Sequence, residues 1–267
     1  MSSSFPRKRE SRVSLVVLAF VAILFAAPAA AGPQAPPVDQ WSAAKWRFGP
    51  LAVTPTLQLK NLGWDSNVFN ETENPKSDFT TTADAIVDWW LRLGRGRLHG
   101  VDVFEGVYFA TYSSQSGFNQ RHDLTFLLPL NRLEPYVGGY YLSTNDRPGY
   151  EINARVRHTE TSVNGGAIVR MTSRINVDFS ARQTKYKYQD APGYEETDFA
   201  KTLDRTTENY GAQFRYRITP LTTLTLLADS VQERFTESPG RDNDGFRILP
   251  GVEFDPHALI QGKARLG

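Results

Sequence analysis

Residues 209–231 constrain the fold of this chain more than any other stretch. From Asn209 to Ile218, apolar and polar side chains alternate one by one. This period of two is the pattern of a β-strand with one apolar face. After Thr219 and Pro220 the alternation resumes and continues to Val231. Two strands joined by so short a link lie antiparallel, so the stretch predicts a β-hairpin.

The same unit recurs from Leu51 onward, so we predict an all-β protein of about eleven antiparallel strands in up-and-down order. Pro55 lacks a backbone N–H, which predicts that the first strand lies at a sheet edge or a bulge. The expected strands cover 51–62, 82–93, 97–112, 121–130, 133–144, a strand ending near Met171, a strand from Ile175, the two arms of the hairpin, 246–255 and 260–266.

The predicted links alternate in length along the chain. Short links follow every second strand, as at Gly94-Arg95-Gly96 and Thr172-Ser173. The other links are long and polar, and they cover 63–81, 113–120, 145–149, 187–204 and 236–243. Short turns on one rim and long loops on the other are typical of outer-membrane β-barrels, with the short turns periplasmic. A Greek-key sandwich has no reason to keep this order.

The alternation assigns each side chain to one of two environments. About ten tilted residues per strand span roughly 23 Å, close to the ~25 Å apolar band of a membrane barrel. We therefore predict a transmembrane barrel whose outer face meets lipid and whose inner face lines a lumen. The residues expected to line the lumen are Asp84, Asp88, Arg92, Asp178, Arg182, Gln213, Arg215, Arg217, Asp229, Arg247 and Glu253. Those expected to face lipid are Val87, Trp89, Leu91, Ile175, Val177, Phe179, Tyr210, Phe214, Tyr216, Phe246, Ile248 and Val252.

Composition agrees with this interpretation and excludes other classes. The chain has 267 residues, a net charge of +1 and 40% hydrophobic residues, a modest share that fits strands with one polar face. It contains no cysteine, which excludes disulfides, thiolate catalysis and cysteine-ligated metals. The near-neutral charge gives no indication of nucleic-acid binding.

The N-terminal residues predict export from the cytoplasm. Residues 1–31 combine the basic run Arg7-Lys8-Arg9, a short apolar run and Ala29-Ala30-Ala31, as a cleaved signal peptide does. An uncleaved anchor helix is the alternative. Residues 32–50, with several prolines, predict a periplasmic linker, and Trp41 and Trp46 within it are expected either at the water–lipid boundary or in mobile chain.

The third expected domain, residues 51–267, is the barrel itself. The sequence stops at Gly267 within an expected strand, and eleven strands is an odd number. Bacterial single-chain barrels use even numbers. We therefore expect a C-terminally incomplete barrel of about 12 to 18 strands in total.

Two groups of residues could carry chemistry. Asp65, Ser66 and Asn67 with Asn70, Glu71 and Glu73 offer oxygen ligands for Ca²⁺, although Asx-turns explain the same residues without a metal. His158, Glu160, Ser162 and Asn164 share one strand face, as the residues of a membrane hydrolase would. Neighbours at i and i+2 lie ~7 Å apart, too far for a hydrogen bond between nucleophile and base. We predict no catalytic residue, no cofactor and no metal.

One loop points to a known family. At Pro55, at Trp64-Asp65-Ser66-Asn67-Val68-Phe69-Asn70 and at Asn74-Pro75-Lys76-Ser77-Asp78, the chain resembles the β-barrel porin 2 family of Gram-negative outer-membrane proteins. The resemblance implies a bacterial outer-membrane barrel, in some members tied to exopolysaccharide export, and it implies no catalytic residues.

The expected function is passive passage of polar solutes, or export of an envelope polysaccharide, through the outer membrane. The expected partners are outer-membrane lipid and these solutes, and no nucleic acid. A non-conducting structural or adhesive barrel is the first alternative, and an outer-membrane hydrolase is the second. The oligomeric state does not follow from the sequence.

Overall fold

The computed structural model describes residues 37, 39–71, 73–147, 155–190, 198–254 and 262–267. The chain divides into two units, Met1–Gly32 and Pro33–Gly267, and every described residue belongs to the second. The predicted signal peptide, residues 1–31, therefore lies outside the described residues. The cleavage of that peptide and the limits of the three expected domains stay predictions.

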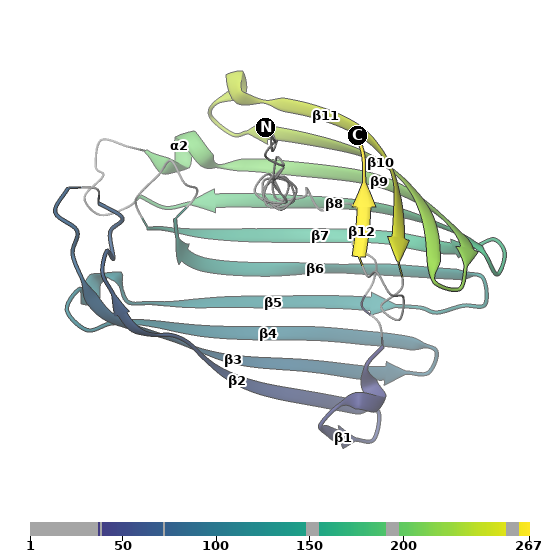
Figure 1. Cartoon of the computed structure of the whole chain (residues 1–267), viewed down its shortest axis with the longest axis horizontal. Coiled ribbons are helices and arrows are strands. Elements are labelled where there is room, and N and C mark those ends of the chain that lie inside the picture. Colours follow the sequence, from purple (N-terminus) through teal and green to yellow (C-terminus); the bar gives the residue numbers. More distant parts are fainter. Residues whose placement is uncertain (1–36, 38, 72, 148–154, 191–197, 255–261) are drawn as a thin grey trace, which may run out of the picture. The chain divides into compact units, whose positions relative to one another are not determined.

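One antiparallel sheet of twelve strands makes up the described structure, and each strand pairs with its neighbours in sequence (Figure 1). The prediction of an all-β, up-and-down fold is thus confirmed. No pairing between β1 and β12 is found among the described residues, so closure into a barrel stays a prediction. The strands are β1 Trp46–Phe48, β2 Leu51–Asp65, β3 Asp78–Leu93, β4 Gly96–Phe109, β5 Gly117–Leu127, β6 Leu133–Asp146, β7 Val156–Arg170, β8 Ile175–Tyr188, β9 Arg205–Thr219, β10 Thr222–Phe235, β11 Asn243–Phe254 and β12 Gly262–Arg265.

The twelfth strand, absent from the sequence-based prediction, is β1. It lies within residues 32–50, so the predicted linker ends as part of the sheet. Gly49, with a φ of 59°, makes the tight turn that folds β1 back onto β2. Three residues are too few to show an alternating pattern, so β1 cannot be predicted from periodicity.

The edge position predicted for Pro55 is confirmed. β1 pairs with β2 only as far as Val53. Pro55 therefore lies in the part of β2 whose described partner is β3 alone. A register shift between Lys60 and Gly63 marks a bulge, and Asn61 within it has a φ of 51°. β2 therefore bends at its far end while remaining paired with β3.

Several strands extend further into the long loops than their polar composition predicts. β3, for example, starts at Asp78 instead of Thr82. The buried Asp78 carboxylate accepts backbone N–H bonds from Phe79, Thr111 and Tyr112 at 2.8–2.9 Å. It therefore ties the start of β3 to the end of β4, and the ladder continues through residues that resemble a loop.

The links alternate in length as predicted. Residues 49–50, 94–95, 128–132, 171–174 and 220–221 form short links on one rim of the sheet, whereas the other rim carries the longer connections (Figure 1). Three of these longer connections contain short helices, η2 Ser113–Gln115, α2 Phe199–Leu203 and η3 Pro239–Arg241. The link between β11 and β12, expected as a turn at Pro256 and His257, lies outside the described residues.

Helix α2 covers the long-loop end of the sheet. Asp198 caps it by accepting the N–H of Lys201 at 2.9 Å. Phe199 is buried against Val156 and Tyr188. Among the described residues, none of the helices has the length and apolar character needed to cross a membrane.

Glycines allow close contacts between strands, which yields a test of the packing. An added Cβ at Gly166 would lie 2.2 Å from the carbonyl oxygen of Phe179 and 2.5 Å from the hydroxyl of Tyr136. We expect Gly166→Ala to lower the free energy of unfolding by about 1–3 kcal/mol, because a well-packed position is overfilled. Urea unfolding in detergent micelles measures the change. Gly106→Ala is the control, since its Cβ would meet nothing closer than 4.0 Å; equal losses in both variants would contradict the packing.

Candidate functional site: the two faces of the sheet

The pairing register divides the side chains of the sheet into two sets. Residues opposite one another on neighbouring strands share a face, as do every second residue along a strand. Asp178 on β8, for example, is opposite Gln213 on β9, which is opposite Leu227 on β10. Followed across the sheet, the register places all the predicted lumen-lining residues on one face and all the predicted lipid-facing residues on the other. We call these the polar face and the apolar face; what each face meets stays a prediction.

Exposure on the two faces is the reverse of that in a soluble protein. On the polar face, Asp178 and Gln213 are each only 2% exposed. On the apolar face, Phe179 is 52% and Phe246 69% exposed. Soluble proteins bury large apolar side chains and rarely expose them as a continuous patch. Within the described residues, no second sheet covers the apolar face.

The exposed apolar side chains form a continuous belt across β8 to β11. Four successive cross-strand rows make up this apolar belt: Ile175–Tyr216–Leu224–Val252, Val177–Phe214–Leu226–Pro250, Phe179–Ala212–Ala228–Ile248 and Ala181–Tyr210–Ser230–Phe246. The next row is polar on every strand: Gln183–Glu208–Gln232–Asp244. From the first row to this polar row the strands rise roughly 26 Å, or about 20 Å when tilted as in membrane barrels.

Tyr210 lies at the boundary of the apolar belt. Its ring belongs to the last apolar row, and its hydroxyl donates to Oε2 of Glu208 in the polar row at 2.9 Å. Gln183 donates to Oε1 of the same glutamate at 2.8 Å. A tyrosine with an apolar ring and a polar tip is the residue type that marks membrane–water boundaries.

Asp102 on β4 is a charged residue on the apolar face, and it is absent from the predicted site residues. Asp102 accepts from Nε1 of Trp89 at 2.9 Å, and its other oxygen lies 2.7 Å from Nδ1 of His122. Trp89, predicted to face lipid, thus lies on the apolar face and also binds this carboxylate. Both oxygens are satisfied, which lowers the cost of a carboxylate in apolar surroundings. The only sign of this contact in the sequence is a charged residue at a β4 position that the alternation assigns to the apolar face.

Ion pairs on the polar face run along the wall of the sheet. Lys60 on β2 binds Asp84 at 2.5 Å and Glu105 at 3.2 Å. Arg247 on β11 donates to Asp229 on β10, with Nε 3.0 Å from Oδ2. In the described part of the chain, the ion pairs between strands join strands that are adjacent or next but one in the sheet. Charges of both signs therefore neutralise one another locally.

A short segment before β1 lies on the polar face at the short-link rim, and we call residues 39–45 the N-terminal strap. Trp41 and Ala44 pack on the cluster of Ala52, Trp90, Leu127 and Tyr136, whose side chains belong to the polar face. Nε1 of Trp41 donates to the carbonyl of Pro50 at 3.2 Å. The sequence predicts Trp41 either at a membrane boundary or in mobile chain, whereas in the structure Trp41 packs on the polar face.

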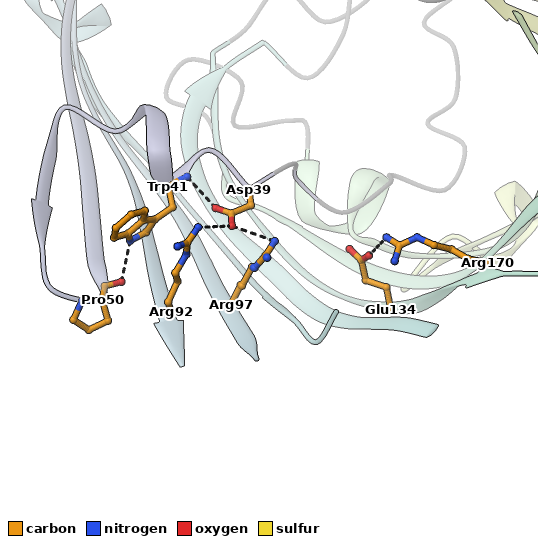
Figure 2. Close-up of polar contacts among 7 residues, drawn as sticks. All are labelled: Asp39, Trp41, Pro50, Arg92, Arg97, Glu134 and Arg170. Atoms are coloured by element: carbon orange, nitrogen blue, oxygen red, sulfur yellow. Dashed lines mark hydrogen bonds and ion pairs between the residues drawn. The ribbon is translucent and has the colours of Figure 1, made fainter. Parts of the chain in front are cut away.

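Asp39 holds the strap in place (Figure 2). One carboxylate oxygen accepts the N–H of Trp41 at 2.9 Å. The other lies 3.1 Å from Arg92 on β3 and 3.1 Å from Arg97 on β4. Arg92, a predicted lumen residue, also lies over the ring of Trp41, with 4.1 Å between the guanidinium carbon and the ring centroid.

The first loop forms the local contacts of an Asx-turn, and the absence of a metal there stays a prediction. Oδ1 of Asp65 accepts the N–H of Asn67 at 2.9 Å, and the side chain of Asn67 exchanges two hydrogen bonds with the backbone of Glu71 at 2.8 and 3.0 Å. Among the described residues, no three histidine or acidic side chains come together as a metal site would require. The Asx-turn alternative accounts for this loop.

The four residues considered for hydrolysis share the polar face but do not form a catalytic set. Nε2 of His158 lies 3.6 Å from Glu160, and Ser162 accepts a hydrogen bond from Thr184 at 3.0 Å. Ser162 and His158 are four strand positions apart, about 13 Å along the strand. A nucleophile and its base need hydrogen-bond contact, so the geometry offers no support for a hydrolase.

Comparisons with known proteins give little further information. No family model and no curated protein matches the chain. Among solved structures, the NanC porin in a rhombohedral crystal form is similar, with a TM-score of 0.39 and 13% identity, covering 77% of this chain and 94% of that chain. A likeness at this level carries no argument about function. Membership of the β-barrel porin 2 family therefore stays a prediction.

The contacts of Asp39 predict how the strap responds to pH. Burial raises the pKa of Asp39, but the Trp41 N–H and the guanidinium groups of Arg92 and Arg97 outweigh burial and lower the pKa below its usual range. A lowered folded-state pKa stabilises the contact above the unfolded pKa of about 3.9 and loses it as pH falls through the folded value. Arg47, whose guanidinium carbon lies 5.5 Å from the centroid of the Trp41 ring, is a further cation beside the strap.

We expect hydrogen-exchange protection of the Trp41 amide, corrected for the intrinsic exchange rate, to be constant from neutral pH down to about pH 4 and to fall below it. The Arg92 amide, bonded to the Pro50 carbonyl at 3.0 Å, is the internal control and should keep its protection. Protection of Trp41 that persists through strong acid would contradict the role of the Asp39 carboxylate.

Proposed function

We propose that this chain is a porin-like outer-membrane barrel whose apolar face meets lipid and whose polar face lines a path for polar solutes. The observation that carries the proposal is the apolar belt, exposed in register over four strands and bounded by a polar row. A large apolar surface in contact with water is unfavourable, whereas the same surface in hydrocarbon incurs no such penalty.

Backbone hydrogen bonding between the strands supports a membrane location in which strands cross the bilayer. Every strand from β2 to β11 has a hydrogen-bonded neighbour on each side. In hydrocarbon each unpaired backbone group costs several kcal/mol, so the edges at β1 and β12 have to be paired for the sheet to span a bilayer. The proposal therefore includes closure of the sheet into a barrel.

The polar face favours an open, hydrated path over a filled interior. Its ion pairs join strands that are adjacent or next but one along the wall, instead of reaching across a lumen. Arg215, Arg217 and Arg247 on this face keep part of their surface exposed. Charged groups are stable where water reaches them. Charges of both signs suit polar solutes in general, and an envelope polysaccharide is the more specific candidate.

The first test compares adjacent residues on opposite faces. Phe179→Arg places a charge in the apolar belt and should lower folding stability in bilayers by about 2–4 kcal/mol. Ser180→Arg is the matched control, because Ser180 is the next residue on β8, lies on the polar face and is only partly buried. Equal losses at both positions would contradict the assignment of the faces.

The second test is single-channel recording of the purified full chain in planar lipid bilayers. We expect discrete, ohmic conductance steps, because a hydrated path lined by charges of both signs conducts small ions. Asp229→Asn should shift the permeability ratio towards anions without abolishing conductance, because it leaves the charge of Arg247 unpaired. A folded, inserted protein that remains silent would instead favour the non-conducting structural or adhesive barrel.

A further inference from the structure

Arg92 and Arg97 form an unusual pair at the short-link rim. They are direct cross-strand partners on β3 and β4, separated in sequence by the link at Gly94 and Arg95. Like charges directly opposite one another in a sheet repel and destabilise the pairing. An anion that contacts both guanidinium groups removes this repulsion and adds charge-assisted hydrogen bonds.

The structure shows one anion there, and it comes from the same chain. One oxygen of Asp39 lies 3.1 Å from both guanidinium groups. The Asp39 side chain is 13% exposed, whereas those of Arg92 and Arg97 are 43% and 39% exposed. The carboxylate is thus covered by the arginines, while the arginines remain open to solutes arriving from the rim.

Another arginine on the same rim, Arg170, is neutralised in a different way. Arg170 at the end of β7 pairs with Glu134 at the start of β6, so a glutamate of the sheet itself neutralises it (Figure 2). For Arg92 and Arg97, Asp39 is the only acidic partner within the described part of the chain. Their neutralisation therefore depends on a residue outside the sheet.

Other residues of the strap make weaker contacts near the ion pairs of Asp39. Lys45 donates from Nζ to the Pro55 carbonyl at 3.3 Å and from its backbone to Thr54 at 3.4 Å. Trp41 and Ala44 are only partly buried on their apolar cluster. The remaining contacts are few and partly exposed, so loss of the Asp39 contact is expected to release the strap.

We propose that Arg92 and Arg97 are an anion-binding site occupied by Asp39 as an internal ligand, and that carboxylate or phosphate groups of solutes compete with Asp39 and release the strap from the polar face. The guanidinium pair matches such groups in charge and geometry. The inference does not depend on conduction, because release of the strap is measurable whether or not the sheet forms an open pore.

A single-cysteine reporter tests the proposal, since the chain has no cysteine of its own. Ala44→Cys, introduced into the full-length protein, places a thiol under the strap, where reaction with a small neutral maleimide should be slow. Asp39→Asn in this background should raise the labelling rate about tenfold, because a hydrogen-bonded charge pair is lost. Arg97→Gln removes the same contact from the sheet side and should have a similar effect.

Glu134→Gln is the matched control, because it removes a carboxylate from the same rim without touching the strap. Its labelling rate should equal that of the parent protein, and circular dichroism verifies that each variant keeps its sheet. Unchanged labelling in both Asp39→Asn and Arg97→Gln, or an equal rise in Glu134→Gln, would overturn the role of Asp39.

Competition by solutes is tested in the parent reporter protein with sodium phosphate against sodium chloride at equal ionic strength. Phosphate should accelerate labelling more than chloride does, because it bridges both guanidinium groups. The difference should vanish in Arg92→Gln, where the pair is broken. Equal acceleration by the two salts would show general screening and would overturn the anion site.

Discussion

The hydrogen-bonded ladder between neighbouring strands determines the position of every side chain in the sheet. Because side chains alternate with a period of two, a slip of one residue between two strands would turn all the apolar groups of one strand to the polar face. The pairing keeps Val177, Phe214, Leu226 and Pro250 in one row and Gln183, Glu208, Gln232 and Asp244 in another. The sharp boundary between apolar and polar rows exists only because this register is kept over four strands.

The same ladder explains how so many charges share the polar face. Cross-strand neighbours bring Asp229 beside Arg247, and Lys60 reaches both Asp84 and Glu105. Each of these charges is compensated by a group on a nearby strand, so the compensation needs no contact across an interior. On the apolar face the Asp102 carboxylate is also paired locally, with Trp89 and His122 as its partners.

The short-link rim differs from the rest of the polar face because its compensation comes partly from outside the sheet. Arg170 has a sheet residue, Glu134, as its partner, but Arg92 and Arg97 rely on Asp39. In a segment that precedes the sheet in sequence, one carboxylate between two guanidinium groups therefore supplies the charged contact to the sheet. This contact links local electrostatics at the rim to the position of residues 39–45 on the polar face.

The sequence alone determined the strand periodicity, the up-and-down order, the alternation of short and long links and the division of side chains into two sets, because each of these is a local property of a strand or a turn. Strand ends were less predictable: Asp78 extends β3 by accepting N–H groups from the end of β4, a contact between residues 33 and 34 positions apart. β1, the Asp102–His122 pair and the contact of Asp39 with Arg92 and Arg97 appeared only in the tertiary structure. β1 is too short to show a period of two, and the partners of Asp102 and Asp39 are distant in sequence, so only the folded sheet brings them together.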